Sequence, residues 1–351
     1  MNDISRNLTA LSEMRKIALT EMAQWSKKYG AIRVPIRTKH NGLAVQILGE
    51  NSILRGKWIT FVDFLLTYMI EKLTSAWGNS EISKPEENRH QIIKLYQELC
   101  KWQIANGAVE GIVQETYPSG FAQEYLSIAW DLFLVEDNFV LPENLIVRMK
   151  DRKNYQGARY ELHIISCLLR SGYKLKYENE ADGKTRHVEL HAIDKRTAEV
   201  MAVEAKSRHR NGIIDFYSKS QLDSASLGIR RLIADAMTKP TTAPYYLFID
   251  VNLGVIPLNE FYMKYRDEIC SIIDSLENKY DGESGSPISG YFITNNPTHY
   301  IGENPVPPDS GFNIYIEGKN PRNNRCSREF IFNVLAGLKM QSSIPTFLIY
   351  E

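Results

Sequence analysis

The sequence predicts an α/β domain over residues 151–351, with a mixed central sheet flanked by helices, after a mainly α-helical domain over residues 1–150. Three observations support this organisation. Apolar runs at 200–203 and 245–251 are rich in strand-forming residues, as is typical of buried strands. Longer segments with apolar residues at helical spacing separate these runs. The first 150 residues consist mostly of such helical segments.

Apolar residues recur every three or four positions through most of the first 150 residues, which predicts amphipathic helices. These expected helices span residues 5–29, 58–77, 86–102 and 119–134, and another begins at Pro142. Alternating residues on both sides of the turn signal His40-Asn41-Gly42 predict a small hairpin at 31–48. Aromatic residues follow the helical stripes, so we assign them to the core and not to a catalytic site.

The second part of the chain alternates between strands and helices. A charged stretch at 149–154 marks its start and is either a linker or the end of one helix. Beyond it we expect helices at 157–171, 213–238, 258–280 and 330–338, and strands at 173–178, 186–194, 200–207, 245–251, 291–294, 313–316 and 346–350. The succession of strand, helix and strand over 200–251 favours a right-handed crossover within a mixed sheet.

Two charged residues interrupt the apolar strand at 200–207. Glu204 and Lys206 lie two positions apart, and such residues project from the same face of a strand. Burying either charge is unfavourable unless a partner neutralises it. A structural Glu–Lys salt bridge in an unrelated α/β domain is the simplest explanation of such a pair in isolation. The residues upstream therefore decide whether the pair has a further role.

Two further carboxylates precede this strand. In its predicted strand, Glu189 lies on a polar face between His187 and His191. Glu161 falls on the apolar stripe of its own predicted helix, where a carboxylate needs a partner. A zinc site built from the two histidines and Glu161 is one alternative, because imidazole nitrogens and carboxylate oxygens both bind zinc.

The order of these elements resembles the PD-(D/E)XK nuclease superfamily, which has the restriction-endonuclease-like fold. A helix with Glu161 is followed by a strand, a strand with Glu189, a strand with Glu204 and Lys206 in a Glu-x-Lys motif, a helix and a strand. The pattern is most similar to the Mrr-type and archaeal junction-resolvase-like branches, which also carry an acidic residue on the first helix. The resemblance covers about residues 155–255.

The resemblance implies a nuclease that uses Mg²⁺ or Mn²⁺ to cleave phosphodiester bonds. Glu189 and Glu204 match the family's metal-binding acids, and Glu161 matches an acid near the outer shell of the metal or a second ion. Lys206 matches the residue that orients or deprotonates the attacking water, or neutralises the developing charge. Glu189 stands where the family usually has Asp, and Val188 where it has Pro. These departures favour an alternative, a catalytically inactive member that binds nucleic acid or serves as a protein scaffold.

The chain has 42 Lys and Arg against 42 Asp and Glu, so any contact with nucleic acid needs a local basic patch. We expect this patch at the end of the strand at 200–207, where Arg208 and Arg210 follow, although a solvated charged face explains the charges equally well. The expected partner is nucleic acid, with DNA favoured over RNA. The resemblance is also compatible with a homodimer.

Four scattered cysteines without C-x-x-C spacing fit neither a zinc site nor a disulfide framework, and they indicate a reducing compartment. The N-terminus lacks the charged and apolar pattern of a signal peptide. The most apolar run, at 58–70, is too short to cross a bilayer and contains Asp63. We therefore expect a cytoplasmic protein that does not contact a membrane.

Overall fold

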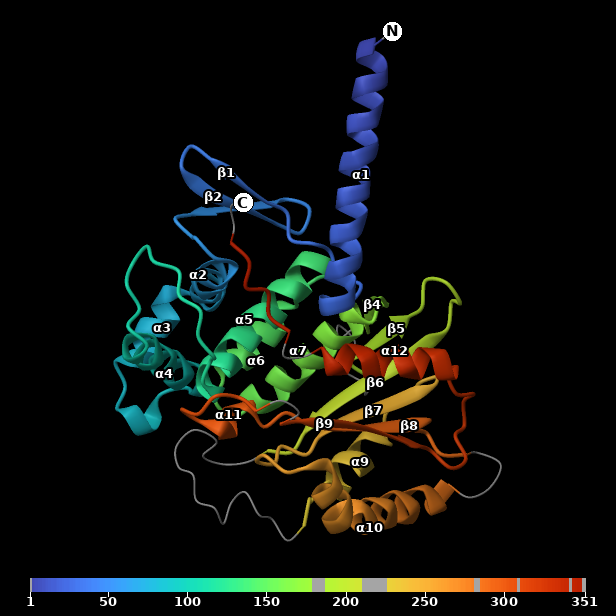
Figure 1. Ribbon diagram of the computed structural model, residues 1–351. Helices are drawn as coiled ribbons and strands as arrows, with labels where there is room; N and C mark the ends of the chain where they lie inside the picture. Colours follow the sequence, from blue (N-terminus) through green and yellow to red (C-terminus); the bar gives the residue numbers. More distant parts are fainter. Residues whose placement is uncertain are drawn as a thin grey trace.

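A six-stranded mixed sheet forms the centre of the protein (Figure 1). The computed structural model describes residues 2–178, 187–209, 226–280, 285–307, 310–340 and 343–348. The strands lie in the order β4 (Lys174–Tyr177), β5 (Leu190–Ile193), β6 (Val200–Ser207), β7 (Tyr245–Asp250), β8 (Gly290–Asn295) and β9 (Phe312–Glu317). β4, β5 and β6 form an antiparallel meander, β6, β7 and β8 are parallel, and β9 is antiparallel to β8. The predicted α/β architecture with a mixed sheet is therefore confirmed.

Helices cover both faces of this sheet (Figure 1). One face carries α7 (Tyr155–Arg170) and α12 (Arg328–Lys339), and the opposite face carries α9 (Arg230–Ala236) and α10 (Leu258–Glu277). The alternation of β6 separates its side chains between the two layers. Val203 and Ala205 belong to the hydrophobic cluster with α7, whereas Ala202 belongs to the cluster with α9 and α10. Because both faces are covered, β6 reads as an almost continuous apolar run.

The helix α7 is buried along almost its whole length, so its polar side chains find their partners inside the protein. The helices that precede it in the chain are α2 (Phe61–Leu73), α3 (Ser75–Ile82), α4 (Gln91–Ala105), α5 (Gly120–Asn138) and α6 (Glu143–Lys150), with a 3-10 turn η1 (Glu86–Asn88) before α4. α5 and α6 pack against α7, and α2 and α4 pack against α5. One hydrophobic cluster includes both Trp130 of α5 and Val203 of β6. The division of the chain near residue 150 stays a prediction.

The N-terminal helix α1 (Asn2–Tyr29) projects from the body of the protein (Figure 1). Its last turns pack into the core through Trp25 and Tyr29. A three-stranded antiparallel sheet follows, with β1 (Arg37–His40), β2 (Leu43–Leu48) and β3 (Ser52–Gly56). β1 and β2 confirm the predicted hairpin, and Asn41 and Gly42 both adopt the positive φ that its tight turn requires. β3 was not predicted, because its sequence offers only two apolar residues.

The single helix expected at 58–77 is wrong, because the chain forms two helices there. Thr74 ends α2 with a left-handed φ of 69° and so breaks the helical path. Its side chain then accepts a hydrogen bond from the backbone N–H of Trp77 and caps the start of α3. A threonine within an apolar helical pattern gave no sequence signal of this break.

The other elements of the second part lie near their expected positions, with a short helix α11 (Thr298–Ile301) and a 3-10 turn η2 (Asn278–Tyr280) in addition. Of the long helix expected at 213–238, residues 213–225 lie outside the described part of the chain, and α9 is the described helix. The strand expected at 346–350 appears as one bridge between Leu348 and Thr60. None of the described helices has the length and apolarity needed to span a membrane.

Candidate functional site

The charged pair of β6 lies on the face of the sheet that α9 and α10 cover. Glu204 shares this face with Ala202, whose side chain belongs to the α9–α10 hydrophobic cluster. The Glu204 side chain is fully buried, and Lys206 remains partly exposed. Lys206 Nζ lies 2.5 Å from Glu204 Oε1, so the two side chains meet as their spacing predicts.

A second lysine completes the surroundings of Glu204. Lys239 follows α9, and its Nζ lies 2.5 Å from Glu204 Oε1 and 2.7 Å from Oε2. Two ammonium groups therefore hold one buried carboxylate, which offsets the cost of its desolvation. The sequence reasoning missed Lys239, since the crossover that brings it back to β6 is a feature of the tertiary fold.

Glu189 lies beside this pair, one residue before the start of β5. The pairing of β5 with β6 ends at Leu190 and Val203, so no residue of β5 faces the next backbone amide of β6. The Glu189 carboxylate takes that place, and its Oε2 accepts a 2.8 Å hydrogen bond from the N–H of Ala205. Ala205 is the middle residue of the Glu-x-Lys motif. The carboxylate of Glu189 is thus fixed next to the motif.

The electrostatics of Glu189 reflect the neighbouring acids. The residue as a whole is half-buried. Burial of its carboxylate raises the pKa of Glu189 well above its usual range, and the charges of Glu204 and Glu161 raise it further, against the opposing effect of Lys206. The pKa of Lys206 is also raised, because Glu204 and Glu189 outweigh the lowering effect of burial. Lys206 is therefore a cation at neutral pH.

Glu161 is already neutralised in this arrangement. It projects from α7, is buried, and accepts two hydrogen bonds from the guanidinium of Arg148 in α6, at 2.7 and 2.9 Å. Arg148, in the preceding helix, is thus the partner of Glu161, and the two form a bidentate charge-assisted pair. Glu161 still contributes to the raised pKa of Glu189, so the three predicted acids lie in one electrostatic neighbourhood.

The carboxylates of Glu189 and Glu204 could hold a metal ion, although no third ligand lies close to them among the described residues. Among the described residues, no group of three or more His, Cys, Asp or Glu side chains is close enough to hold a metal ion. Mg²⁺ commonly binds through only one or two carboxylates and keeps several waters. Glu189 and Glu204 offer two such carboxylates, so they fit this ion. A cation there would compete with Lys206 and Lys239 for Glu204.

The zinc alternative finds no support in the described part of the chain. His191 Nδ1 lies 3.1 Å from Glu178, and burial lowers the pKa of His191. Glu161 is paired with Arg148 instead of with a histidine. Of the two arginines expected to contact nucleic acid, Arg208 lies just beyond β6 and donates to the carbonyl of Ser226, and Arg210 lies outside the described residues.

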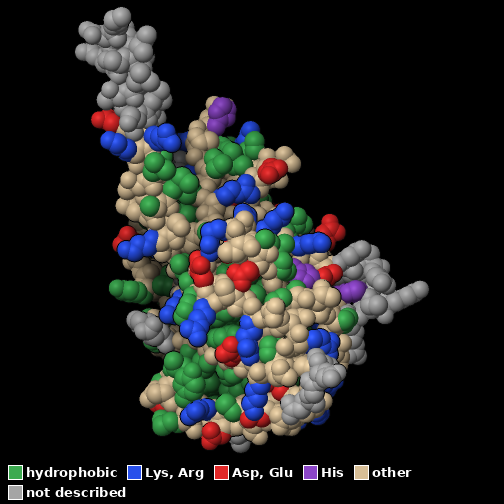
Figure 2. All heavy atoms as spheres, turned by 90° about the vertical axis from the view of Figure 1, so that its right-hand side faces the viewer, with side chains coloured by type: hydrophobic (Ala, Val, Ile, Leu, Met, Phe, Trp, Pro, Cys, Tyr) green, Lys and Arg blue, Asp and Glu red, His purple; other side chains and the backbone are tan. Residues whose placement is uncertain are grey.

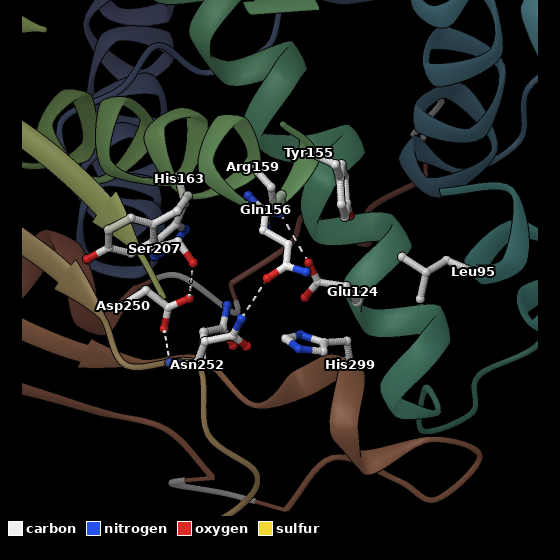
Figure 3. Close-up of a pocket in the computed structure, with 12 residues that line it drawn as sticks. Leu95, Glu124, Tyr155, Gln156, Arg159, His163, Ser207, Asp250, Asn252 and His299 are labelled. Atoms are coloured by element: carbon white, nitrogen blue, oxygen red, sulfur yellow. Dashed lines mark hydrogen bonds and ion pairs between the residues drawn. The ribbon is translucent and has the colours of Figure 1, made fainter. Parts of the chain in front are cut away.

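Sequence reasoning also missed a polar site on the α7 side of the sheet, near the ends of β6 and β7. Asp131 of α5 accepts hydrogen bonds there from Arg159 (2.7 Å) and Ser166 (2.6 Å), and Arg170 lies 3.4 Å away. A small cavity adjoins this network (Figure 3). Apolar periodicity gives no sign of it, because polar residues on α7 follow no recognisable motif.

The resemblance to the PD-(D/E)XK nucleases rests on the order of elements and on Glu161, Glu189, Glu204 and Lys206. These residues come from α7, from the start of β5 and from β6. Comparison with models of protein families, with curated proteins and with solved structures found no match.

Proposed function

We propose that the protein is a metal-dependent phosphodiesterase that acts on nucleic acid, with Mg²⁺ or Mn²⁺ as the cofactor and DNA favoured over RNA. The hydrogen bond from Ala205 to Glu189 carries this proposal, because it holds a second carboxylate beside the Glu204–Lys206 motif. A structural salt bridge between Glu204 and Lys206 would need no such neighbour. The succession of α7, β4, β5, β6, α9 and β7 also follows the order expected for the restriction-endonuclease-like fold.

The residues have distinct roles in this proposal. Glu189 and Glu204 would hold the ion, which polarises the phosphoryl oxygen and lowers the pKa of bound water. Lys206 would stabilise negative charge on the phosphate and not act as the base, because its raised pKa keeps it protonated. Part of the raised pKa of Glu189 comes from repulsion by Glu204 and Glu161, which a bound cation would relieve.

A second candidate function is a catalytically inactive scaffold of the same fold. The observation that favours it is the neutralisation of the acids by the protein itself. Lys206 and Lys239 pair with Glu204, and Arg148 pairs with Glu161, so two of the three acids are neutralised without an ion. On the face drawn in Figure 2, basic side chains are interspersed with acidic ones and form no broad basic surface.

Cleavage assays distinguish the two functions. Plasmid, linear duplex DNA, single-stranded DNA and RNA are incubated with the protein and MgCl₂ or MnCl₂, with EDTA as the blank. We expect metal-dependent cleavage that Glu204→Gln and Lys206→Ala abolish. Lys101→Ala, which removes an exposed ion pair with Glu98 on α4, is the matched control and keeps full activity. Binding without cleavage, unchanged in the two site variants, would establish the scaffold instead.

A further inference from the structure

A small cavity lies where the parallel strands β6 and β7 end (Figure 3). Its volume is about 50 Å³, which exceeds the roughly 30 Å³ that one water molecule occupies in the liquid. Ser207 and Asp250, the last residues of the two strands, line it together with residues of α5, α7 and α11. The carboxyl ends of parallel strands are the usual position of ligand sites in α/β proteins.

Glu124 of α5 presents an unsatisfied oxygen at this cavity. Its side chain is 6% exposed, and its Oε1 accepts a 3.1 Å hydrogen bond from Arg159. Its Oε2 is buried and has no hydrogen-bond partner among the described residues. Arg159 cannot neutralise Glu124 fully, because the same guanidinium also donates to Asp131 at 2.7 Å. A buried carboxylate oxygen of this kind is unfavourable unless a donor reaches it.

The opposite wall of the cavity is fixed by a network around Asn252. Its Nδ2 donates to Gln156 Oε1 at 3.0 Å, and its Oδ1 accepts from the hydroxyl of Tyr300 at 3.0 Å. Asn252 adopts a left-handed φ of 47°, a conformation that asparagine tolerates better than most residues. Figure 3 shows Glu124, Gln156, Asn252 and His299 converging on one space. The acceptors around this space are therefore held in place before any ligand arrives.

A second carboxylate and an apolar wall define the ligand further. Asp250 is buried and accepts from the backbone N–H of Asn252 and from Ser207. Burial raises the pKa of Asp250 to about 6, and because this value is still below neutral pH, the carboxylate stays mostly ionised there. Leu95 and the ring of Tyr155 contribute apolar carbon to the wall. Arg159 and His163 also line the cavity, but Arg159 donates to Glu124 Oε1 and to Asp131, so Glu124 Oε2 stays open as an acceptor. An open carboxylate oxygen beside apolar carbon suits an organic amine better than an anion.

We infer that this cavity is a binding site for the primary ammonium group of a small organic molecule, with Glu124 Oε2 as its principal acceptor. The alkyl carbon next to the nitrogen packs against Leu95 and Tyr155. The rest of such a molecule leaves past the partly exposed Asn296 and His299 at the rim. This inference is independent of the nuclease proposal, because Glu204 and Lys206 lie on the other face of β6.

The test uses ¹³C-labelled methylammonium chloride as the probe and NMR titration of the full chain as the measurement. We expect saturable binding to the wild type that is not displaced by an equal concentration of KCl or tetramethylammonium chloride. Glu124→Gln keeps the shape and removes the charge, and should weaken binding about tenfold or more, as for loss of a hydrogen bond to a charged group. Glu260→Gln, exposed on α10, is the control and leaves binding unchanged.

Three outcomes of the titration would overturn the inference: no binding of methylammonium, equal displacement by KCl, or equal affinity in Glu124→Gln. If Glu124→Gln does not fold, a nuclear Overhauser experiment on the wild type still tests the site. Methyl protons of bound methylammonium should show nuclear Overhauser effects to the side chains of Leu95 and Tyr155. Their absence in a sample that binds the probe would place the probe elsewhere and refute the site.

Discussion

Lys239 Nζ lies 2.7 Å from Glu204 Oε2, although the two residues are 35 positions apart in the chain. Lys206 lies 2.5 Å from the other oxygen of the same carboxylate. A fully buried glutamate thus depends on two cations, one from its own strand and one from the crossover that returns to the sheet. This arrangement has direct consequences for stability and for metal binding.

Removing both lysines should destabilise the protein more than the two single changes together. In Lys206→Met or Lys239→Met, the remaining lysine still pairs with Glu204. In the double variant the buried carboxylate has no partner, which costs about 3–5 kcal/mol for a broken buried pair. Urea denaturation of the four proteins of this cycle measures the coupling, with Lys101→Met as the exposed control. Additivity within about 0.5 kcal/mol would show that the lysines do not share one carboxylate.

Releasing Glu161 should strengthen metal binding if the proposed function is correct. Arg148→Gln removes the bidentate partner of Glu161 and leaves an unpaired carboxylate within electrostatic reach of Glu189. We expect about tenfold tighter binding of Mn²⁺ by isothermal titration calorimetry, the scale on which neighbouring groups tune metal sites. Arg231→Gln, which removes an exposed pair with Asp235, is the control. Unchanged affinity in Arg148→Gln would exclude Glu161 from the metal's surroundings.

The pKa of Glu189 should respond in opposite directions to two changes. Burial, Glu204 and Glu161 raise it, and Lys206 opposes them. Glu204→Gln removes a like charge and should lower the pKa, whereas Lys206→Met removes a cation and should raise it further. Carboxyl ¹³C NMR of labelled glutamate follows both shifts across a pH titration. Shifts of the same sign in the two variants would mean that these charges do not act directly on Glu189.

Much of the fold follows from local pattern, and much of the site does not. The run at 200–207 predicted β6 at its observed bounds, because its short, continuous apolar start with two valines is typical of a buried strand. The two-residue spacing of Glu204 and Lys206 likewise implied their contact. These features depend on neighbours in sequence, so the sequence contains enough information to predict them.

The partners of the acids could not be predicted in this way. Lys239 reaches Glu204 through the crossover connection, and Arg148 reaches Glu161 through the packing of α6 on α7. Neither lysine nor arginine differs in local pattern from the many exposed cations of the chain. The break at Thr74 is similar, since a single left-handed residue redirects an otherwise continuous helical pattern. Tertiary packing decides each of these features.

The stability of the protein should fall as the pH rises from neutral to alkaline values because of His163. Burial would lower its pKa, but Cys167 and Asp131 raise it to about 10, above the ordinary 6.5. Because the pKa of His163 is higher in the folded than in the unfolded protein, its protonation stabilises the fold fully below pH 6.5. This contribution is lost as the pH approaches about 10. Tyr160, Arg159 and Asp250 are the other titratable groups around it.

The measurement for His163 is the urea midpoint of the wild type and of His163→Gln at several pH values from 6 to 10. We expect the difference between the two proteins to be largest near pH 6 and to shrink toward pH 10. His40→Gln, exposed on β1, controls for the loss of a histidine as such. A difference that stays constant over this range would mean that His163 is neutral in the folded protein.

Contact between α12 and α7 should depend on the absence of a side chain at Gly337. A Cβ there would collide with the Ser171 hydroxyl and with the backbone carbonyl of Cys167, and the carbonyl is part of α7 and cannot move away. Gly337→Ala should therefore cost about 1–3 kcal/mol, the usual effect of overpacking. Gly157→Ala is the matched control, because a Cβ at this exposed position of α7 meets no atom within 4 Å. The control should gain about 0.5–1 kcal/mol in the free energy of unfolding, from the better helical preference of alanine. Equal gains in both variants, measured by urea denaturation, would show that α12 does not pack closely on α7.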